Sequence, residues 1–282
     1  MQRMKRTVVR AAWLLSALAC PSLVLAQQDV PVPMDDARIA QAILDAEATG
    51  RAIYLHDQAA AVASDAVMEL KAFRQDGKQG RLGGWITEQR DEGIVVTFLS
   101  SDAVPRARYR VTVSSEGRVM GDVEALTEPA ALTPHELGAA RARNTAANAE
   151  FAPCSRNYNT VVLPGPREGG GWIAYLLPGT TKHGVIPIGG SYRLDMDATG
   201  LERLKQRSFT KTCIALESPS EDKARETVAV MITHLLDPAP TEVHVFWSLW
   251  SRTPMFVVTS EGNWLIEEGK ITLKERRKEE RS

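Results

Sequence analysis

The sequence has no excess of basic residues, only three cysteines and, beyond its N-terminal segment, no long apolar run. Its 34 lysines and arginines are offset by 35 aspartates and glutamates. Nucleic-acid binding requires a basic surface that displaces counterions from phosphate, so this balance argues against a nucleic-acid partner. A membrane-spanning helix needs about 20 consecutive apolar residues, so we expect no transmembrane segment after residue 26.

The motifs that identify most metal sites, cofactor sites and hydrolases are also missing. The five histidines lie ten or more positions apart and no Cys-x-x-Cys pair occurs, so the spacing predicts no metal site. The alternative is a site assembled from distant segments, with His183, His234 and His244 as its candidates. The segment 189–192 (GGSY) lacks the last glycine of the Gly-x-Ser-x-Gly motif that positions a nucleophilic serine. The glycine run 169–171 lacks the lysine of a phosphate-binding loop, and we expect no cofactor.

The N-terminal segment predicts export from the cytoplasm. Its first part is positively charged and contains no acid, its middle is apolar from Ala11 to Cys20, and small or modest-sized residues precede Gln27. This order is typical of a secretory signal peptide, so we expect cleavage near Ala26 and a periplasmic or secreted protein. The alternatives are a retained anchor, which Pro21 interrupts, and lipidation of Cys20, whose neighbours fit a lipid-attachment signal poorly.

The predicted mature chain is acidic and long enough for a sizeable core. Removal of residues 1–26 leaves 256 residues with a net charge of −5. This length suits one large or two small domains. We divide it into a first region (27–150), a second region (151–273) and a charged, solvated tail (274–282).

Two cysteines remain in the predicted mature chain, Cys154 and Cys213. An isolated pair in an oxidising compartment is best interpreted as one disulfide. A loop of about 60 residues closed in this way stabilises the fold by about 4 kcal/mol in the chain-entropy model. The alternative is a catalytic thiol, which needs a nearby histidine and a lowered pKa, and no pattern around either cysteine indicates one.

Apolar spacing and turn residues predict that the first region begins with helices and continues as a β-meander. Helices are expected over 35–48, ended by Gly50, and over 57–73. Alternating patterns then predict strands over 84–86, 94–99 and 109–113. A capping box formed by Thr133 and Glu136, with Pro134 at its preferred position, predicts a further helix to about residue 149.

The second region is again mostly β in pattern. Strands are expected over 160–163, 171–177, 184–188, 191–196 and 208–216. A charged loop over 217–225 is expected to enter a helix that ends near Leu236. A last hairpin is expected to contain strands over 243–250 and 255–259.

A weak internal repeat relates the two regions. Gly-Trp-Ile occurs at 84–86 and 171–173, and each copy is followed by Tyr-Arg and an aliphatic residue, at 109–111 and 192–194. A fainter third copy begins at Phe256. The predicted fold is therefore α+β, with antiparallel β-meanders in two or three related copies covered by several helices. The general similarity of β-hairpins is the alternative explanation.

An aromatic cluster is the most unusual local feature. Phe246, Trp247 and Trp250 lie on a predicted strand that is apolar on both faces. Such a strand lies either in the core or at a candidate interaction surface. The absence of catalytic motifs favours a non-enzymatic binding or interaction module of the cell envelope, whose partner is another envelope protein or a small ligand.

The alternative function is an envelope hydrolase with dispersed catalytic residues. Its polar candidates are His183, Asp195 and His244. Asp195 and Asp197 are expected on one face of a strand, as are Glu242 and His244. A pocket that holds two of the polar candidates within hydrogen-bond reach would favour the enzyme.

Overall fold

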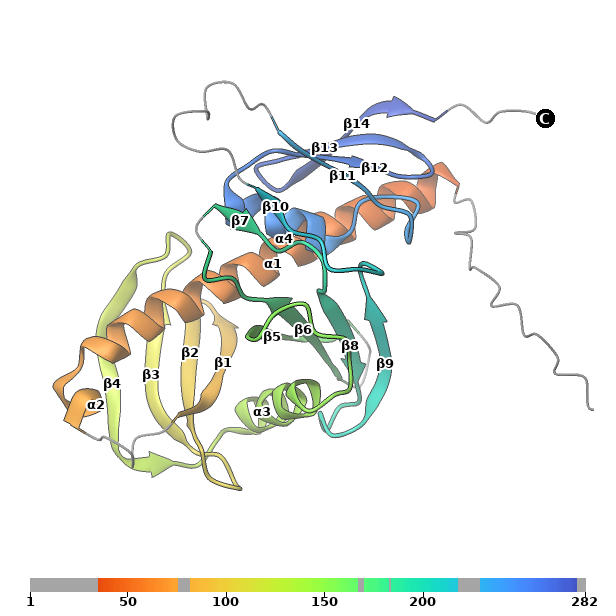
Figure 1. The fold of residues 1–282 in the computed structure, drawn as a ribbon. Coiled ribbons are helices and arrows are strands. Elements are labelled where there is room, and N and C mark those ends of the chain that lie inside the picture. Colours follow the sequence, from red (N-terminus) through yellow and green to blue (C-terminus); the bar gives the residue numbers. More distant parts are fainter. Residues whose placement is uncertain (1–34, 76–81, 167–169, 183, 218–228, 278–282) are drawn as a thin grey trace, which may run out of the picture. The chain divides into compact units, whose positions relative to one another are not determined.

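Three four-stranded sheets, with helices packed against them, form most of the described chain (Figure 1). The computed structural model describes residues 35–75, 82–166, 170–182, 184–217 and 229–277. The predicted signal peptide, nearly all of the charged loop over 217–225 and the end of the tail lie outside these ranges. The α+β class and the antiparallel β-meanders predicted from the sequence are confirmed.

The first sheet is an antiparallel meander in the order β1-β2-β3-β4. Its strands are β1 (Leu82–Arg90), β2 (Gly93–Ser100), β3 (Ala107–Val113) and β4 (Val119–Ala130). Every residue of β2 is buried, whereas buried and partly exposed residues alternate along β3. The central strand is therefore covered on both faces, and β3 shows the period of two that predicted it.

The second sheet repeats this topology in the order β5-β6-β8-β9. Its strands are β5 (Tyr158–Pro164), β6 (Trp172–Pro178), β8 (Tyr192–Met196) and β9 (Arg203–Ser208). A separate pair is formed by β7 (Val185–Ile186) and β10 (Leu216–Glu217). The strand predicted over 208–216 is wrong, because the hydroxyl of Thr210 accepts the Gly190 N–H and donates to the Thr212 carbonyl, which turns the chain.

The third sheet has the order β11-β12-β13-β14. Its strands are β11 (Val230–Thr233), β12 (Met255–Val258), β13 (Gly262–Glu267) and β14 (Lys270–Arg276). The helix predicted to end near Leu236 is wrong over β11, where buried and exposed residues alternate with a strand period. Residues 274–276 of the predicted tail belong to β14 and are exposed.

Helix α1 (Asp36–Glu69) is continuous, where the sequence predicted two helices separated at Gly50. A Cβ atom at Gly50 would lie 2.5 Å from the Glu242 carbonyl oxygen and 2.6 Å from the Cβ of Val245. Both belong to helix α4 (Glu242–Ser251). Gly50 is therefore the point of closest approach between two helices, and not a helix end. A short helix, α2 (Lys71–Gln75), follows α1.

Three buried polar side chains of α1 each bind a different sheet. Glu47 accepts the backbone N–H of Ile271 in β14 at 2.7 Å. The His56 ring contacts the Thr87 hydroxyl in β1 at 2.7 Å. Asp57 accepts a hydrogen bond from the side-chain amide of Asn159 in β5 at 2.9 Å. Since a buried polar group is costly without its partner, these contacts fix the position of α1 against all three sheets.

The other long helices differ in how well the sequence predicted them. Helix α3 (Pro134–Ala147) begins with the predicted capping box, which is confirmed. Helix α4 occupies the segment 242–251, so the strand predicted over 243–250 is wrong. Val243, Val245, Phe246 and Trp247 are all buried. A helix that is apolar on most sides is buried among other elements, and over ten residues its pattern resembles that of a buried strand.

The predicted disulfide is confirmed between Cys154 and Cys213, whose sulfur atoms are 2.01 Å apart. It joins the segment that precedes β5 to the loop that follows β9. No helix within the described ranges is long and apolar enough to cross a bilayer.

The internal repeat is only partly reproduced by the topology. Tyr109-Arg110-Val111 and Tyr192-Arg193-Leu194 lie on β3 and β8, the third strands of the first and second sheets. The two Gly-Trp-Ile motifs do not correspond, because one lies on the first strand of its sheet and the other on or just before the second. Phe256 lies on β12, the second strand of the third sheet.

Candidate functional site

The two polar candidates that the structure describes, Asp195 and His244, do not line a common pocket. His183 lies outside the described residues. Asp195 lies on β8, where its carboxylate accepts a hydrogen bond from Arg193 Nε at 2.7 Å. His244 lies on α4 and is buried. Asp195 and His244 instead belong to two arms of a charged network around the N-terminus of α4.

Arg193 forms the first arm of this network. Besides Asp195, its guanidinium contacts Glu242 Oε1 at 3.4 Å. The hydroxyl of Tyr175 donates to the same oxygen at 3.1 Å, and burial, together with the Glu242 charge, raises the pKa of that hydroxyl. Although burial opposes ionisation of Arg193, its contacts with Tyr175, Asp195 and Glu242 raise its pKa above the usual value. Arg193 is therefore a permanent cation held between two carboxylates.

Arg207 forms the second arm. It lies directly opposite Arg193 in the β8–β9 pair, an arrangement of like charges that is destabilising by itself. Its guanidinium binds Asp237 Oδ2 at 2.6 Å, and His234 Nε2 donates to the same oxygen at 2.8 Å. Burial opposes ionisation of Asp237, but these two donors lower its pKa to about 2. The Asp237 carboxylate thus compensates the charge of Arg207.

His244 connects the second arm to the helix. Its Nδ1 accepts the backbone N–H of Thr241 at 3.1 Å and lies 2.9 Å from the Thr241 hydroxyl. Its ring meets the His234 ring edge-on, with centroids 4.6 Å apart. Because a backbone N–H can only donate, Nδ1 is unprotonated and the neutral ring carries its proton on Nε2. Burial, followed by the proximity of His234, lowers the pKa of His244, in agreement with a neutral ring.

A pocket of about 250 Å³ lies within this network, which we call the charged pocket. Arg193, Arg207, Asp237, Thr241 and Glu242 line it, together with one side of α1 and the loop before α4. Asp195 and His244 bind lining residues but do not line the pocket themselves. The sequence pointed to two neighbours of the pocket and missed its arginines, because the repeated Tyr-Arg motif includes Arg193 and no pattern indicated Arg207.

Two pairs predicted to share a strand face are placed differently. Asp197 follows β8, and its carboxylate accepts the backbone N–H groups of Leu201 and Glu202, which closes the β8–β9 turn. It therefore does not lie beside Asp195 on a strand. Glu242 and His244 lie on a helix, where residues two positions apart point in different directions. Neither pair forms a carboxylate dyad or a carboxylate–imidazole dyad.

The aromatic candidates are mainly core residues. The exposed fractions of Phe246 and Trp247 are 1% and 2%, so neither contributes to an accessible interaction surface. Trp247 Nε1 donates to the hydroxyl of Ser191 at 3.3 Å, which satisfies its polar atom in the core. Trp250 is partly exposed and packs edge-on against Trp247.

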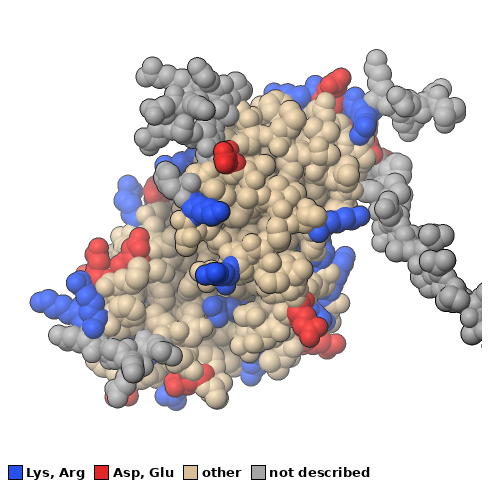
Figure 2. All heavy atoms as spheres, in the orientation of Figure 1, with Lys and Arg blue, Asp and Glu red and all other residues tan. Residues whose placement is uncertain are grey.

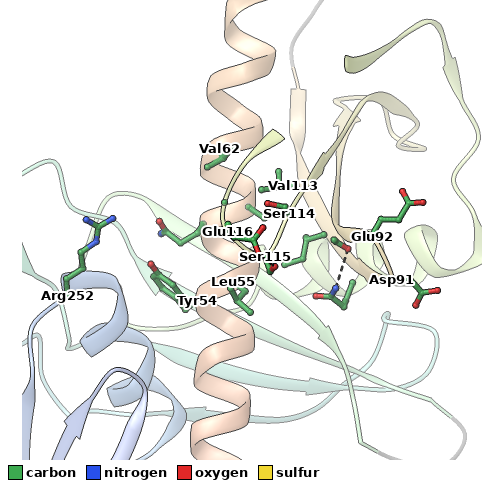
Figure 3. Close-up of a pocket in the computed structure, with 16 residues that line it drawn as sticks. Tyr54, Leu55, Val62, Asp91, Glu92, Val113, Ser114, Ser115, Glu116 and Arg252 are labelled. Atoms are coloured by element: carbon green, nitrogen blue, oxygen red, sulfur yellow. Dashed lines mark hydrogen bonds between the residues drawn. The ribbon is translucent and has the colours of Figure 1, made fainter. Parts of the chain in front are cut away.

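A second pocket, of about 400 Å³, is a groove over α1 (Figure 3). We call it the α1 groove. Its floor is a face of α1 that includes Tyr54, Leu55 and Val62. Its walls include the turns β1–β2 (residues 91–92) and β3–β4 (residues 114–117). The groove therefore combines an apolar helix face with polar turns.

The groove ends at α4. Arg252, which caps the C-terminus of α4 with a positive φ of 52°, also lines it. In Figure 3 Arg252 lies on the opposite side of α1 from Asp91 and Glu92. No sequence pattern indicated this groove, because its lining residues come from four separate segments of the chain.

Charge elsewhere is dispersed on the face shown in Figure 2, where acidic and basic side chains lie singly or in small mixed groups between large uncharged areas. Among the described residues, no group of three or more histidine, cysteine, aspartate or glutamate side chains is arranged to hold a metal ion.

Comparison of the chain with protein-family models, curated proteins and solved structures found no match.

Proposed function

We propose that this protein is exported to the cell envelope and acts there as a non-enzymatic binding module, with the α1 groove as the site that holds its partner. The observation that carries the proposal is the groove itself. Leu55 and Val62 pack against the core, and their side chains remain partly exposed in the groove. A concave surface with an apolar floor and polar walls is typical of binding sites.

The rigidity of the groove supports the same function. Its floor is a helix that three buried polar contacts, from Glu47, His56 and Asp57, fix to three sheets. Its walls are short turns between paired strands. A preformed site loses less conformational entropy on binding than a mobile one, so such a scaffold favours recognition.

Site-specific photo-crosslinking in cells tests the groove. A photoreactive phenylalanine analogue is placed at Val62 in the full chain, and a matched control carries it at Lys205, an exposed residue of β9. The proposal expects a discrete crosslinked species from position 62 that is absent from position 205. Absence of that species at position 62, or equal crosslinking at both positions, contradicts the proposal.

The mass of the protein isolated from the envelope separately tests cleavage before Gln27.

One observation favours the alternative function, an envelope hydrolase. Thr241 lines the charged pocket, and its hydroxyl lies 2.9 Å from His244 Nδ1, the distance expected between a nucleophile and its base. The Thr241 N–H donates to the same nitrogen, and the lowered pKa of His244 makes it a weak base. Both facts favour a helix cap over a catalytic dyad.

An activity screen separates the two functions. Purified protein is tested on chromogenic esters, phosphates and peptides, beside its Thr241→Ala variant. The binding proposal expects equal, background turnover for both proteins. Turnover by the native protein that the Thr241→Ala variant lacks would instead assign Thr241 as a nucleophile and replace the proposed function.

A further inference from the structure

The walls of the α1 groove carry charge of one sign on the side of the sheet. Asp91 and Glu92 form the β1–β2 turn and are both exposed. Within the described residues, no hydrogen bond or ion pair engages either carboxylate. Carboxylates that have no partner among the described residues are available to a binding partner.

The second turn adds a third carboxylate. Glu116 accepts a hydrogen bond from the Ser115 hydroxyl at 2.7 Å, and its other oxygen lies 3.7 Å from Arg118. Hydrogen bonds from Ser115 and Ser114 lower the pKa of Glu116, so its carboxylate is ionised at neutral pH. Figure 3 shows Glu116 and Ser115 beside α1, next to Leu55.

Cationic charge within the groove is small in comparison. Among the described residues that line it, Arg252 is the only cationic one. It extends from the end of α4, on the side away from Asp91 and Glu92 (Figure 3). The groove is therefore polarised, with two carboxylates that bind no described residue at one end and one guanidinium at the other.

The floor between these ends is apolar. Ala59 is buried beneath it, and Leu55 and Val62 are partly exposed in it. An occupant that matches both features places apolar side chains on α1 and cationic side chains at the β1–β2 turn. Lysine and arginine suit this arrangement, because their aliphatic stems pack on apolar surface while their charged ends reach a carboxylate.

We propose that the occupant of the α1 groove is a basic amphipathic peptide segment of a partner protein, whose cationic side chains bind Asp91 and Glu92 and whose apolar side chains pack on Leu55 and Val62. This inference rests on the proposed function, because it names the chemistry of the partner that the groove holds. A purely acidic segment is excluded from the sheet side of the groove by like-charge repulsion.

Fluorescence anisotropy with defined peptides tests the charge. The probe is a fluorescein-labelled octapeptide of alternating lysine and leucine, titrated with the purified exported protein. A second peptide has glutamate in place of lysine, and a third has serine in place of leucine. The lysine–leucine peptide is expected to bind at least about tenfold more tightly than either, and to weaken as NaCl rises from about 50 to about 300 mM.

Matched variants locate the binding. Asp91→Asn combined with Glu92→Gln is expected to raise the Kd of the lysine–leucine peptide about fivefold, since each exposed ion pair contributes modestly. Asp102→Asn combined with Glu128→Gln removes two exposed carboxylates that do not line the groove, and no change is expected. An equal effect of both double variants, or binding of the glutamate–leucine peptide as tight as that of the lysine–leucine peptide, overturns the inference. If crosslinking from Val62 persists in either case, the groove is still the binding site and only its charge preference is wrong.

Discussion

Helices α3 and α4 begin in the same way and yet lie in opposite electrostatic environments. In each, a threonine is the N-cap and the third helical residue reaches back to the threonine N–H. Glu136 Oε2 accepts the N–H of Thr133 at 2.8 Å, and His244 Nδ1 accepts that of Thr241 at 3.1 Å. The two helices thus satisfy the same unpaired donor, one with a carboxylate and one with an imidazole.

The surroundings explain the choice of residue. Glu136 is buried, but Arg110 donates to both of its oxygens, at 3.0 and 3.2 Å, and the Thr97 hydroxyl donates to Oε1. His244 is buried as deeply, next to His234 and without a cation bound to it in the described chain. Of these two buried cap residues, the charged one is therefore the one whose counter-charge is buried with it.

Replacement of the α4 imidazole by the α3 carboxylate is the strongest test of this comparison. His244→Glu restores the standard capping-box sequence, yet we expect it to lower the free energy of unfolding by roughly 4 kcal/mol at pH 7, because an ionised carboxylate is buried without a bound cation. Urea denaturation measures the loss. The matched His244→Gln variant, which is neutral, should lose less.

The pH dependence of His244→Glu gives an independent check. Burial raises the pKa of such a carboxyl in the folded state, so the loss should shrink as the pH falls from 7 to about 5. In the native protein the pKa of His244 is lowered, so its contribution is present above the unfolded value of 6.5 and is lost as the pH falls. If the stability lost in His244→Glu does not change with pH, burial of an ionised carboxylate is not the cause of the loss.

Removal of the α3 carboxylate is the reciprocal test. Glu136→Ala should cost about 3 kcal/mol, because it leaves Arg110 without its main partner and the Thr133 N–H unsatisfied. Glu136→Gln retains a hydrogen-bonding group and should cost less.

Although burial opposes ionisation of Glu136, Arg110 and Thr133 lower its pKa below 4.5. Native stability should therefore fall as the pH drops below about 4.5 towards the folded-state pKa, and the Glu136→Gln variant should lose this part of the dependence.

The contact between α1 and α4 separates local from tertiary effects. In an isolated helix Gly50→Ala would stabilise by about 1 kcal/mol. Here we expect a loss of about 2 kcal/mol, because the new Cβ would meet the Glu242 carbonyl and Val245. Thermal unfolding of this variant, beside Ala48→Gly at an exposed position of α1, measures the difference. A stabilised Gly50→Ala variant would show that the two helices separate easily.

The smallest expected effect concerns the two cap hydroxyls. The Thr133 hydroxyl accepts the Glu136 N–H at 3.2 Å, so Thr133→Ala should cost about 1 kcal/mol. The Thr241 hydroxyl contacts only the His244 ring in its cap, so Thr241→Ala should cost about half as much. Chemical denaturation of both variants in parallel would refute this order if Thr241→Ala proved the more damaging.

Features that depend on neighbouring residues could be predicted from the sequence. The capping box of α3, the alternation along β3 and β8, and the disulfide between two isolated cysteines follow from spacing, turn chemistry and redox compartment, and the structure has all of them. These features need only a few residues to be specified, which is why the α+β class could be predicted.

Features that require distant segments to meet could not be predicted from local patterns and depend on the folded chain. The local sequence at Gly50 is typical of a helix end, but α1 continues through it. Glycine is required there because α4 packs too closely for a Cβ atom. The apolar run 243–250 fits a buried strand as well as a buried helix, and only its position between α1 and the third sheet makes it helical. The charged pocket and the α1 groove likewise combine residues up to about 200 positions apart, which no local pattern encodes.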